Sequence, residues 1–556
     1  MLTRCLSVMS LGVLALVAVP AIAPAIVEDE PNLEAIYRIK QEAFQGSQLE
    51  ETLFYLTDVH GPRLTGSPGY IAAAKWAIDQ LTEWGISTPR LEKWGELGRG
   101  WSYSRLAVHM LEPMATTLHG VPLAWSSGTD GPVSGDAILA TVSTGQDDPK
   151  EIEKAIKDYS EKYRGKLDGK IVLINPAREF ESPTEPALDR LDDDELDELA
   201  EAPEPMRLPP FEWPIKEFPT DPKVISRLYE DAPATLAEAY SHALSGAREK
   251  LNQFLLDEGV AAVLSVGSGG DGSLIFADGG MAFRTGSPVP PPSIVLMPEQ
   301  YNGIVRLVEK KIPVRIEVDL TARFHDESLD GMNVIAEIPG GEKKDEIVMM
   351  GAHLDSWHGG TGAADNAAGT AVVMEAARIL KTLGLEMDRT VRLALWDAEE
   401  QGLLGSRGYV KNHFADPMTM ELKPEHAKLA AYFNIDTGSG KIRGIYLQQN
   451  DMVRPIFEAW LKPFEDLGAT TIAIRNDSGT DHQSFDEVGL PGFDFIQDPL
   501  DYWTRTHHSN IDVYDHLEVS DLMQAAAILA SFVYHAANRE EMLPREPLPK
   551  PLSVNP

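Results

Sequence analysis

The stretch that decides the fold is residues 351–366, which read GAHLDSWHGGTGAADN. It holds two His and two Asp among small residues, and it directly follows the apolar run IVMM at residues 347–350. Its polar groups therefore lie where a buried strand should end in a loop, which is where an open α/β sheet binds its ligands. We predict that His353 and Asp365 are the first two ligands of a two-metal centre.

Strands and helices alternate from residue 331 onward, as in a mostly parallel sheet. Short apolar runs predict strands covered on both faces over residues 332–338, 346–350, 390–396 and 429–435. Apolar spacing predicts helices over residues 367–383 and 520–538, the second with Ser520 as its N-cap. The predicted fold class is α/β, with a mostly parallel mixed sheet flanked by helices.

The N-terminal half completes this first domain. Residues 26–112 show helical spacing up to Gly85 and then two predicted strands, and HGPRLTGSPG at residues 60–69 is typical of a turn. The second part of the same domain is expected over residues 330–540. A Pro-rich, extended tail is expected over residues 541–556.

A second, β-rich domain is predicted between these parts, over residues 113–329, because short β-like runs there alternate with Gly, Pro and charged loops. An acidic, Pro-rich excursion at residues 180–215 is expected to be a solvated, mobile surface segment. GSGGDG at residues 267–272 formally matches a dinucleotide fingerprint, but SLIF follows it in place of a helix. We therefore expect a glycine loop there.

Length, charge and cysteine content narrow the possibilities. The chain has 556 residues, so two or three globular units are expected. Its formal charge of −37 argues against a basic surface that would bind nucleic acid.

Arg4, an apolar run and small residues up to Ala25 predict a cleaved signal over residues 1–25, and hence a secreted or periplasmic protein without a stable membrane span. A retained anchor is the alternative. The single cysteine, Cys5, lies in this segment, so oxygen and imidazole must hold any metal.

Four further residues are candidates for the rest of the centre. Each alone is more simply interpreted as a turn, a surface pair or a surface histidine. With His353 and Asp365, however, they follow strand ends or precede the last helix, so all six can converge on one rim of the sheet. Two His, two Asp and two Glu suit two zinc-like ions with one bridging carboxylate and leave one residue as a base. The four are Glu399, Glu400, Asp436 and His508.

The segments around these positions carry a family resemblance. GAHLDSW, GAADNAAG, LWDAEEQGLLGS, NID, SGTDHQSF and HHSNID resemble the co-catalytic zinc aminopeptidase and glutamate carboxypeptidase family of metallopeptidases. HGPRLTGSPG and the tandem HHS are most similar to its plasma glutamate carboxypeptidase (carboxypeptidase Q) branch. Residues 165–174 and 258–266 of the insertion resemble a protease-associated domain.

The resemblance implies two Zn²⁺ ions per chain. It implies that Asp365 bridges them, that His353 and Asp436 complete one site, and that Glu400 and His508 complete the other.

The resemblance also assigns roles around the metals. Glu399 would be the general base, and Asp355 and Asp512 would orient the imidazoles from outside. A cis peptide bond is expected between Asp365 and Asn366.

Residues for the substrate are expected nearby. His507 stands where relatives place a Tyr, so we expect it to donate to the tetrahedral oxyanion. Asp481 is the candidate partner for a substrate ammonium. Arg505 is the candidate for a substrate carboxylate, with Arg443 and Arg475 as alternatives.

The implied activity is that of an exopeptidase that cuts terminal bonds of short peptides, as an aminopeptidase or dipeptidase. A carboxypeptidase on the same site, a glutaminyl-cyclase-like acyltransferase with one zinc, and an inactive receptor-like binding protein are the alternatives. A serine hydrolase and a zincin are disfavoured, because neither G-x-S-x-G nor H-E-x-x-H is found. The oligomeric state, a homodimer included, is left open.

Overall fold

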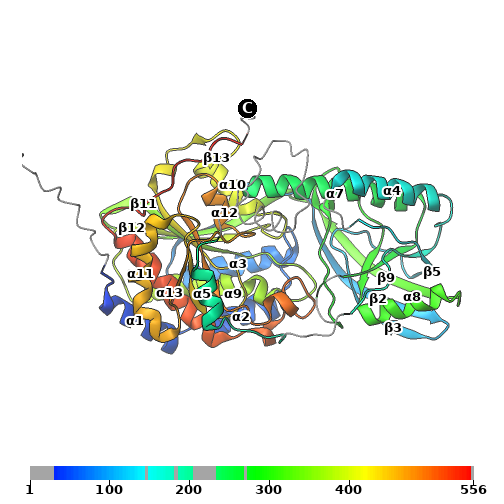
Figure 1. The fold of residues 1–556 in the computed structure, drawn as a ribbon, viewed down its shortest axis with the longest axis horizontal. Helices are drawn as coiled ribbons and strands as arrows, with labels where there is room; N and C mark the ends of the chain where they lie inside the picture. Colours follow the sequence, from blue (N-terminus) through cyan, green and yellow to red (C-terminus); the bar gives the residue numbers. More distant parts are fainter. Residues whose placement is uncertain are drawn as a thin grey trace, which may run out of the picture.

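The computed structural model describes residues 30–144, 148–180, 186–203, 233–267, 269 and 272–552. These residues form two lobes, each built on an eight-stranded sheet (Figure 1). The predicted signal at residues 1–25 lies outside the described residues. Among those that are described, none of the helices is both long and apolar enough to cross a membrane.

The first sheet has the strand order β1-β10-β12-β11-β15-β18-β16-β17. β12, β11, β15 and β18 run parallel at its centre, while β1 and β10 are antiparallel at one edge. The four strands predicted after residue 331 are confirmed, because apolar runs of this kind suit strands covered on both faces. The bounds are β1 Ser87–Glu96, β10 Asp330–Ile338, β11 Lys343–His353, β12 Arg389–Trp396, β15 Leu429–Asn434, β16 Ile442–Tyr446, β17 Thr471–Ala473 and β18 Gly492–Gln497.

Helices cover both faces of this sheet. Val348 and Met350 of β11 pack into the core under α1, α2, α3, α9, α11 and α13, whereas Ile347 and Met349 face α10 and α12. The bounds are α1 Leu33–Gln45, α2 Leu49–Phe54, α3 Pro68–Glu83, α9 Ala368–Thr382, α10 Leu404–His413, α11 Arg454–Leu461, α12 His482–Asp486 and α13 Val519–Asn538.

Both helices predicted in this region exist, but the predicted cap of the last one is wrong. α13 begins at Val519, and the Ser520 hydroxyl donates to Glu518 Oε1 at 2.9 Å instead of capping a backbone N–H. The helix begins before Ser520, so that residue already lies inside its first turn.

The second sheet has the order β3-β2-β9-β5-β6-β7-β8-β4. Three helices that the sequence did not predict, α4, α7 and α8, accompany it (Figure 1). The bounds are β2 Gly100–Glu112, β3 Thr116–Leu118, β4 Gly120–Pro122, β5 Val133–Leu139, β6 Ile171–Leu173, β7 Ala262–Val266, β8 Ser293–Leu296, β9 Arg315–His325, α4 Pro149–Tyr163, α7 Ala234–Asp257 and α8 Pro298–Glu309.

One predicted strand lies in the other lobe. β2 pairs along its length with β9 in the second sheet, although the sequence placed residues 26–112 with the first domain. The pairing is antiparallel, and no local pattern could show which sheet would accept this strand. The limits 26–112, 113–329 and 330–540 stay predictions.

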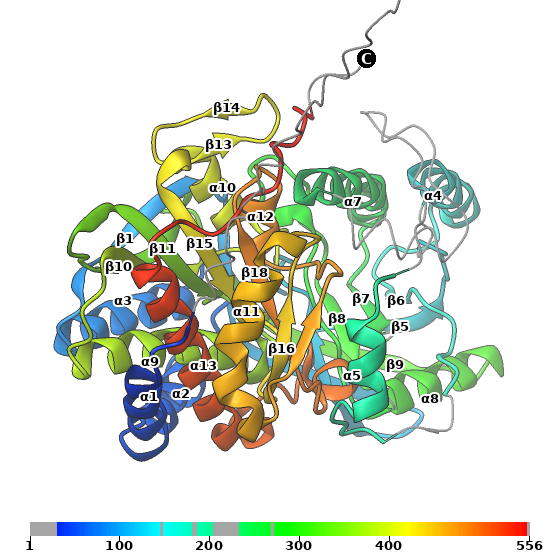
Figure 2. The same ribbon diagram turned by 60° about the vertical axis from the view of Figure 1, so that its left-hand side comes forward.

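The described part of the acidic excursion forms a helix that contacts the first lobe. Within residues 186–203, α5 (Asp193–Ala200) begins with a capping box formed by Asp192 and Glu195 and packs against β17. Figure 2 shows α5 in the same region as β16. Most of these residues are exposed, as expected for a surface segment, and Arg190 joins them to the first lobe through ion pairs. Their mobility stays a prediction.

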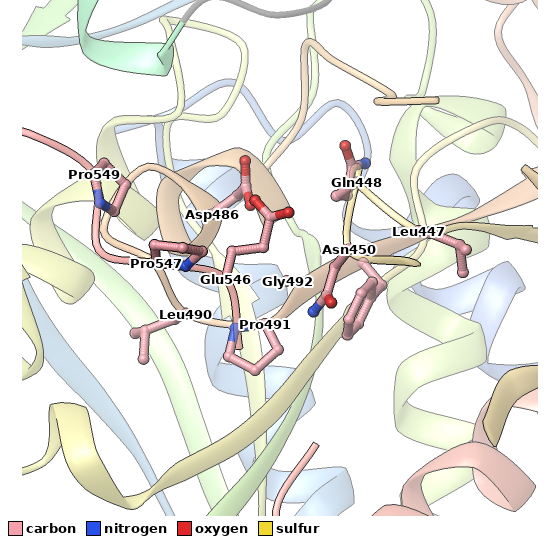
Figure 3. Close-up of a pocket in the computed structure, with 12 residues that line it drawn as sticks. Leu447, Gln448, Asn450, Asp486, Leu490, Pro491, Gly492, Glu546, Pro547 and Pro549 are labelled. Atoms are coloured by element: carbon pink, nitrogen blue, oxygen red, sulfur yellow. The ribbon is translucent and has the colours of Figure 1, made fainter. Parts of the chain in front are cut away.

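The C-terminal tail follows the first lobe without a helix or strand over its described residues. Asn450 donates from Nδ2 to Pro544 O at 2.8 Å, and Arg545 donates to His426 O at 3.0 Å. The tail also lines a cavity of about 90 Å³, and Asp486 and Glu546 are among the residues that line it (Figure 3).

Candidate metal centre

The centre lies at the carboxyl ends of the parallel strands in the first sheet. His353 is the last residue of β11, Glu399 and Glu400 follow β12, and Asp436 follows β15. Because β12, β11 and β15 are adjacent and run in the same direction, residues beyond their ends meet at one edge of the sheet.

Asp365 lies between two groups of donor atoms. Its Oδ1 is 3.2 Å from His353 Nε2, which is itself 3.0 Å from Asp436 Oδ1. Its Oδ2 is 3.5 Å from His508 Nε2, which is 3.0 Å from Glu400 Oε2. The two oxygens of one carboxylate therefore face two different imidazoles, each of which has a second carboxylate beside it.

The donor set fits divalent metal ions. Three groups of side chains each place donor atoms within 4.8 Å of one another: Asp365, His507 and His508; His353, Glu399 and Asp436; and His353, Asp365 and Glu400. Imidazole nitrogen and carboxylate oxygen in this arrangement are ligands that zinc accepts.

The electrostatics of these groups also favour a cation. Burial raises the pKa of Glu399 well above its usual range, and burial beside Asp365 raises the pKa of Glu400 to about 7. At Asp365, burial is outweighed by the hydrogen bond from His353 and by His508, so its pKa lies far below the usual value. Several carboxyl groups thus share a small volume, and divalent cations would offset their mutual repulsion.

Asp355 supports both the imidazole and the two glutamates. Its carbonyl oxygen lies 3.0 Å from His353 Nδ1, and its Oδ1 lies 3.6 Å from the same nitrogen. Its carboxylate also accepts the backbone N–H groups of Glu399 at 3.2 Å and Glu400 at 3.4 Å. One buried aspartate therefore sets the relative positions of strand ends β11 and β12.

Asp512 supports the loop that carries Asp365 and does not contact an imidazole. Its carboxylate accepts the N–H of Ala364 at 2.6 Å and that of Asp365 at 3.2 Å. The predicted contact with an imidazole is therefore replaced by contacts with the backbone. The preceding Gly362 has φ of 69°, and a Cβ there would lie 2.3 Å from Ser356 Cβ, so the loop needs glycine at this point.

Asn366 holds the other side of the loop. Its Nδ2 donates to Asp436 Oδ1 at 2.7 Å and to Ile435 O at 2.9 Å, while its Oδ1 accepts the N–H of Gly369. The peptide bond between Asp365 and Asn366 is cis, as predicted. Asn366 therefore orients a neighbouring carboxylate and also caps the start of α9.

His507 lies beside the centre in the cavity. Its ring stacks on that of His508, with the centroids 3.7 Å apart, and it lines the cavity in front of the carboxylates. Burial lowers the pKa of His507 to about 4, so the ring is neutral at pH 7. A neutral imidazole still carries one N–H that can donate a hydrogen bond.

The residues expected to bind substrate lie elsewhere. Asp481 is fully buried behind the centre, where burial raises its pKa to about 8, and it does not line the cavity. Arg505 is half-buried and is likewise absent from the cavity lining. Arg443 pairs with Asp498, and Arg475 donates to Glu198 O. None of these side chains therefore lines the cavity in front of the centre.

Arg63 is a structural residue that the sequence interpretation missed. It is fully buried and donates to the carbonyl oxygens of Leu354, Leu56, Thr361 and Gly362 at 2.7 to 2.9 Å. Burial lowers its pKa to about 10, although the nearby acids of the centre favour the charged form. The turn at residues 60–69 thus supports the loop that leads to Asp365. In the sequence, only the motif HGPRLTG pointed to this turn.

The cavity in front of the centre has a volume of about 930 Å³ and is lined by both lobes. From the second lobe, Asp278 faces the region of His508 and Arg248 lies further along α7. Asp278 is exposed to solvent within the cavity. The sequence carried no signal for either residue, because each reaches the cavity only through the docking of the two lobes.

Known proteins resemble this chain in sequence and in fold. Residues 333–533 match the model of peptidase family M28. We refer to these matched residues as the M28 segment. This M28 segment contains all six residues of the candidate centre, and the match begins within β10 and ends within α13.

Several curated relatives of the chain are peptidases by name. Carboxypeptidase Q of Mus musculus is 30% identical over 254 residues, which are 46% of this chain and 52% of the relative. Aminopeptidase YwaD of Bacillus subtilis is 31% identical over 212 residues, 36% of this chain and 44% of the relative. The chain thus spans about half the length of the curated relatives that it matches.

Solved structures share the fold over most of the chain. A peptidase M28 precursor from Shewanella amazonensis superposes with a TM-score of 0.61 at 24% identity, covering 93% of this chain and 98% of the other. The zinc aminopeptidase BSAP of Bacillus subtilis gives a TM-score of 0.52 at 18% identity, covering 89% and 96%. The predicted α/β fold class is confirmed by these neighbours.

Proposed function

We propose that the chain is a di-zinc exopeptidase that hydrolyses the terminal peptide bond of short peptides, as an aminopeptidase or dipeptidase. The observation that carries the proposal is the position of Asp365, whose two carboxylate oxygens face His353 on one side and His508 on the other. A carboxylate placed in this way suits a bridge between two metal ions. The names of the curated relatives, carboxypeptidase Q and aminopeptidase YwaD, support peptide hydrolysis.

Zinc is the metal that the donors favour. Two imidazoles and carboxylates, with no thiolate among the candidates, suit zinc, and the structural neighbour BSAP is described as a zinc aminopeptidase. His353 and Asp436 would hold one ion, Glu400 and His508 the other, and Asp365 both. When bound, zinc supplies Lewis acidity to a carbonyl oxygen and to water.

Glu399 is proposed as the general base. It lies in the group with His353 and Asp436, and it lines the cavity where a substrate would enter. A carboxylate there can take a proton from the attacking water and return it to the leaving amine. The neutral ring of His507 is placed to donate a hydrogen bond to the oxygen that becomes negative in the tetrahedral intermediate.

The charges in the cavity favour a substrate with a free amino group. Asp278 and Asp477 line the cavity in addition to the four carboxylates proposed as metal ligands or as the base. Among the cavity-lining residues within the described ranges, Arg248 carries the single guanidinium. Acidic groups therefore outnumber basic ones where a peptide terminus would lie, which supports an aminopeptidase or dipeptidase over a carboxypeptidase.

The test compares one dipeptide with its N-blocked and C-amidated forms, with and without a chelator, on protein whose metal content has been measured. An aminopeptidase should lose activity only on the N-blocked form, and a dipeptidase should lose it on both. Activity lost only on the C-amidated form would indicate a carboxypeptidase. One zinc per chain without hydrolysis would indicate an acyltransferase, and metal-free inactive protein would indicate a binding protein.

Short peptides reaching the protein outside the cytoplasm are the proposed partners. The charged start, apolar run and small residues at positions 1–25 support export to the periplasm or the exterior. Sequencing the N-terminus of secreted protein would test this, because cleavage near Ala25 should remove Cys5 with the signal.

A further inference from the structure

We propose that residues 186–203, here called the strap, close one end of the cavity and restrict the enzyme to short peptides. The strap belongs to the acidic, Pro-rich region that follows β6, yet it lies on the first lobe. This inference rests on the proposed peptidase function. The strap contributes no residue to the candidate metal centre. The proposal gives it a role in substrate specificity instead.

Arg190 anchors the strap through two buried acids. Its Nη1 lies 2.8 Å from Asp498 Oδ2 and 2.7 Å from Asp521 Oδ2. The side chains of these acids are only 1% and 3% exposed, whereas that of Arg190 is 40% exposed. Asp498 also pairs with Arg443, which donates to Leu191 O of the strap at 2.7 Å. Arg190 is the cation that joins Asp498 to Asp521, and buried carboxylates strongly require a cation beside them.

The backbone of the strap is held at the same place. Asp189 N donates to Leu500 O at 2.9 Å, and Leu191 N donates to Asp498 Oδ1 at 3.1 Å. Thr504 Oγ1 donates to Ala187 O at 2.5 Å. These contacts fall on the loop that runs from β18 to His507 and His508, so the strap follows the loop that carries one predicted metal ligand.

The far end of the strap is held by the edge of the first sheet. α5 packs against β17, and Arg475 donates from Nη2 to Glu198 O at 2.6 Å. The strap therefore spans from the loop after β18 to the edge strand β17. It crosses the carboxyl end of β18, which is adjacent to β15 and hence to Asp436.

Two apolar side chains of the strap form a wall of the cavity. Leu191 and Leu199 line it, together with Ile496 and Pro499 of the first lobe. The same cavity contains Glu399 and Asp436, so a peptide bound at the centre and extended toward β18 meets this wall. An extended chain advances about 3.3–3.6 Å per residue, and each added residue in that direction must displace the strap.

The main variant is Arg190→Asp, which places a third acid beside Asp498 and Asp521 and should expel the strap. Arg190→Lys is the matched control, since it keeps a positive charge at the anchor. The readout is the ratio of kcat/KM for a hexapeptide to that for a dipeptide with the same terminal residue. We expect Arg190→Asp to raise this ratio by about tenfold or more and Arg190→Lys to leave it within about threefold of the parent value.

A reversible disulfide controls for the possibility that Arg190→Asp misfolds. Asp189 and Leu500 form an isolated antiparallel bridge, and paired residues in such bridges have Cα separations that a disulfide can span. The pair Asp189→Cys and Leu500→Cys, with Arg190→Asp and Cys5→Ser, should keep the low parental ratio when oxidised. Reduction of this folded protein with a phosphine should raise the ratio, while amide hydrogen exchange over residues 189–200 becomes faster.

The outcomes separate this inference from the proposed function. An equal ratio before and after reduction, with the strap released, overturns the inference. A strap that stays protected after reduction also overturns it, because Arg190 would not be the anchor. Parent protein that cleaves the hexapeptide as well as the dipeptide overturns it too, but leaves the peptidase proposal intact. Zinc-loaded parent that cleaves neither peptide contradicts the proposed function instead.

Discussion

The neighbouring residues Glu399 and Glu400 allow one substitution to test two roles. Changing either to Gln keeps the shape of the side chain and removes its negative charge. Glu400 Oε2 lies 3.0 Å from His508 Nε2, on the side of Asp365 Oδ2. Glu399 belongs instead to the group around His353 and Asp436. The same chemical change should therefore have different consequences at the two positions.

The expected effect of Glu399→Gln is on the rate alone. Loss of a positioned general base lowers turnover by roughly two to four orders of magnitude, which corresponds to about 3 to 5 kcal/mol in the barrier. Both zinc ions and the melting temperature should stay close to those of the parent, because Asp365 and the four other proposed ligands are untouched. The side chain is half-buried, and a neutral amide is easier to bury than a carboxylate.

Glu400→Gln should act on metal binding. Removal of one carboxylate from the site with His508 should lower zinc content from two ions per chain toward one, with a loss of activity that added zinc partly restores. The assay combines metal analysis of each purified variant with dipeptide hydrolysis over a zinc titration. Near-parental turnover in Glu399→Gln, or loss of its zinc, would refute the assignment. An unchanged zinc content in Glu400→Gln would refute the other half.

Three further predictions concern stability and metal dependence. Arg63→Met removes a guanidinium that donates to four carbonyl oxygens, so urea denaturation should show a loss of about 4 kcal/mol, with Arg63→Lys less affected. Burial next to Glu546 raises the pKa of Asp486 to about 7 (Figure 3). The folded state therefore holds this proton between pH 4 and 7, and stability falls as the pH rises through about 7. Asp486→Asn should accordingly raise the melting temperature at pH 8 and leave it unchanged near pH 4, and a rise of equal size at both would contradict this reasoning. Removal of zinc by a chelator should lower the melting temperature of the parent but not that of Asp365→Ala, and equal shifts in both would show that Asp365 is not the shared ligand.

Local sequence patterns were sufficient for the centre of the first lobe. Apolar runs of strand length predicted β10, β11, β12 and β15, because central parallel strands must be apolar on both faces. The polar residues after these runs then had to meet, since adjacent parallel strands end at the same edge. His353, Asp436 and the two glutamates could therefore be grouped from the sequence alone.

Other features depended on contacts between distant parts of the chain. The sequence determined the type of sheet and the donor residues at its edge, because these follow from periodicity and strand direction. Only the tertiary structure placed Arg190 beside Asp498, which is 308 residues away. It also placed Arg63 against the loop that leads to Asp365 and brought Asp278 into the cavity. A buried ion pair or a docked lobe depends on complementary surfaces and desolvated charges, and neither leaves a periodic signal in the segments that form it.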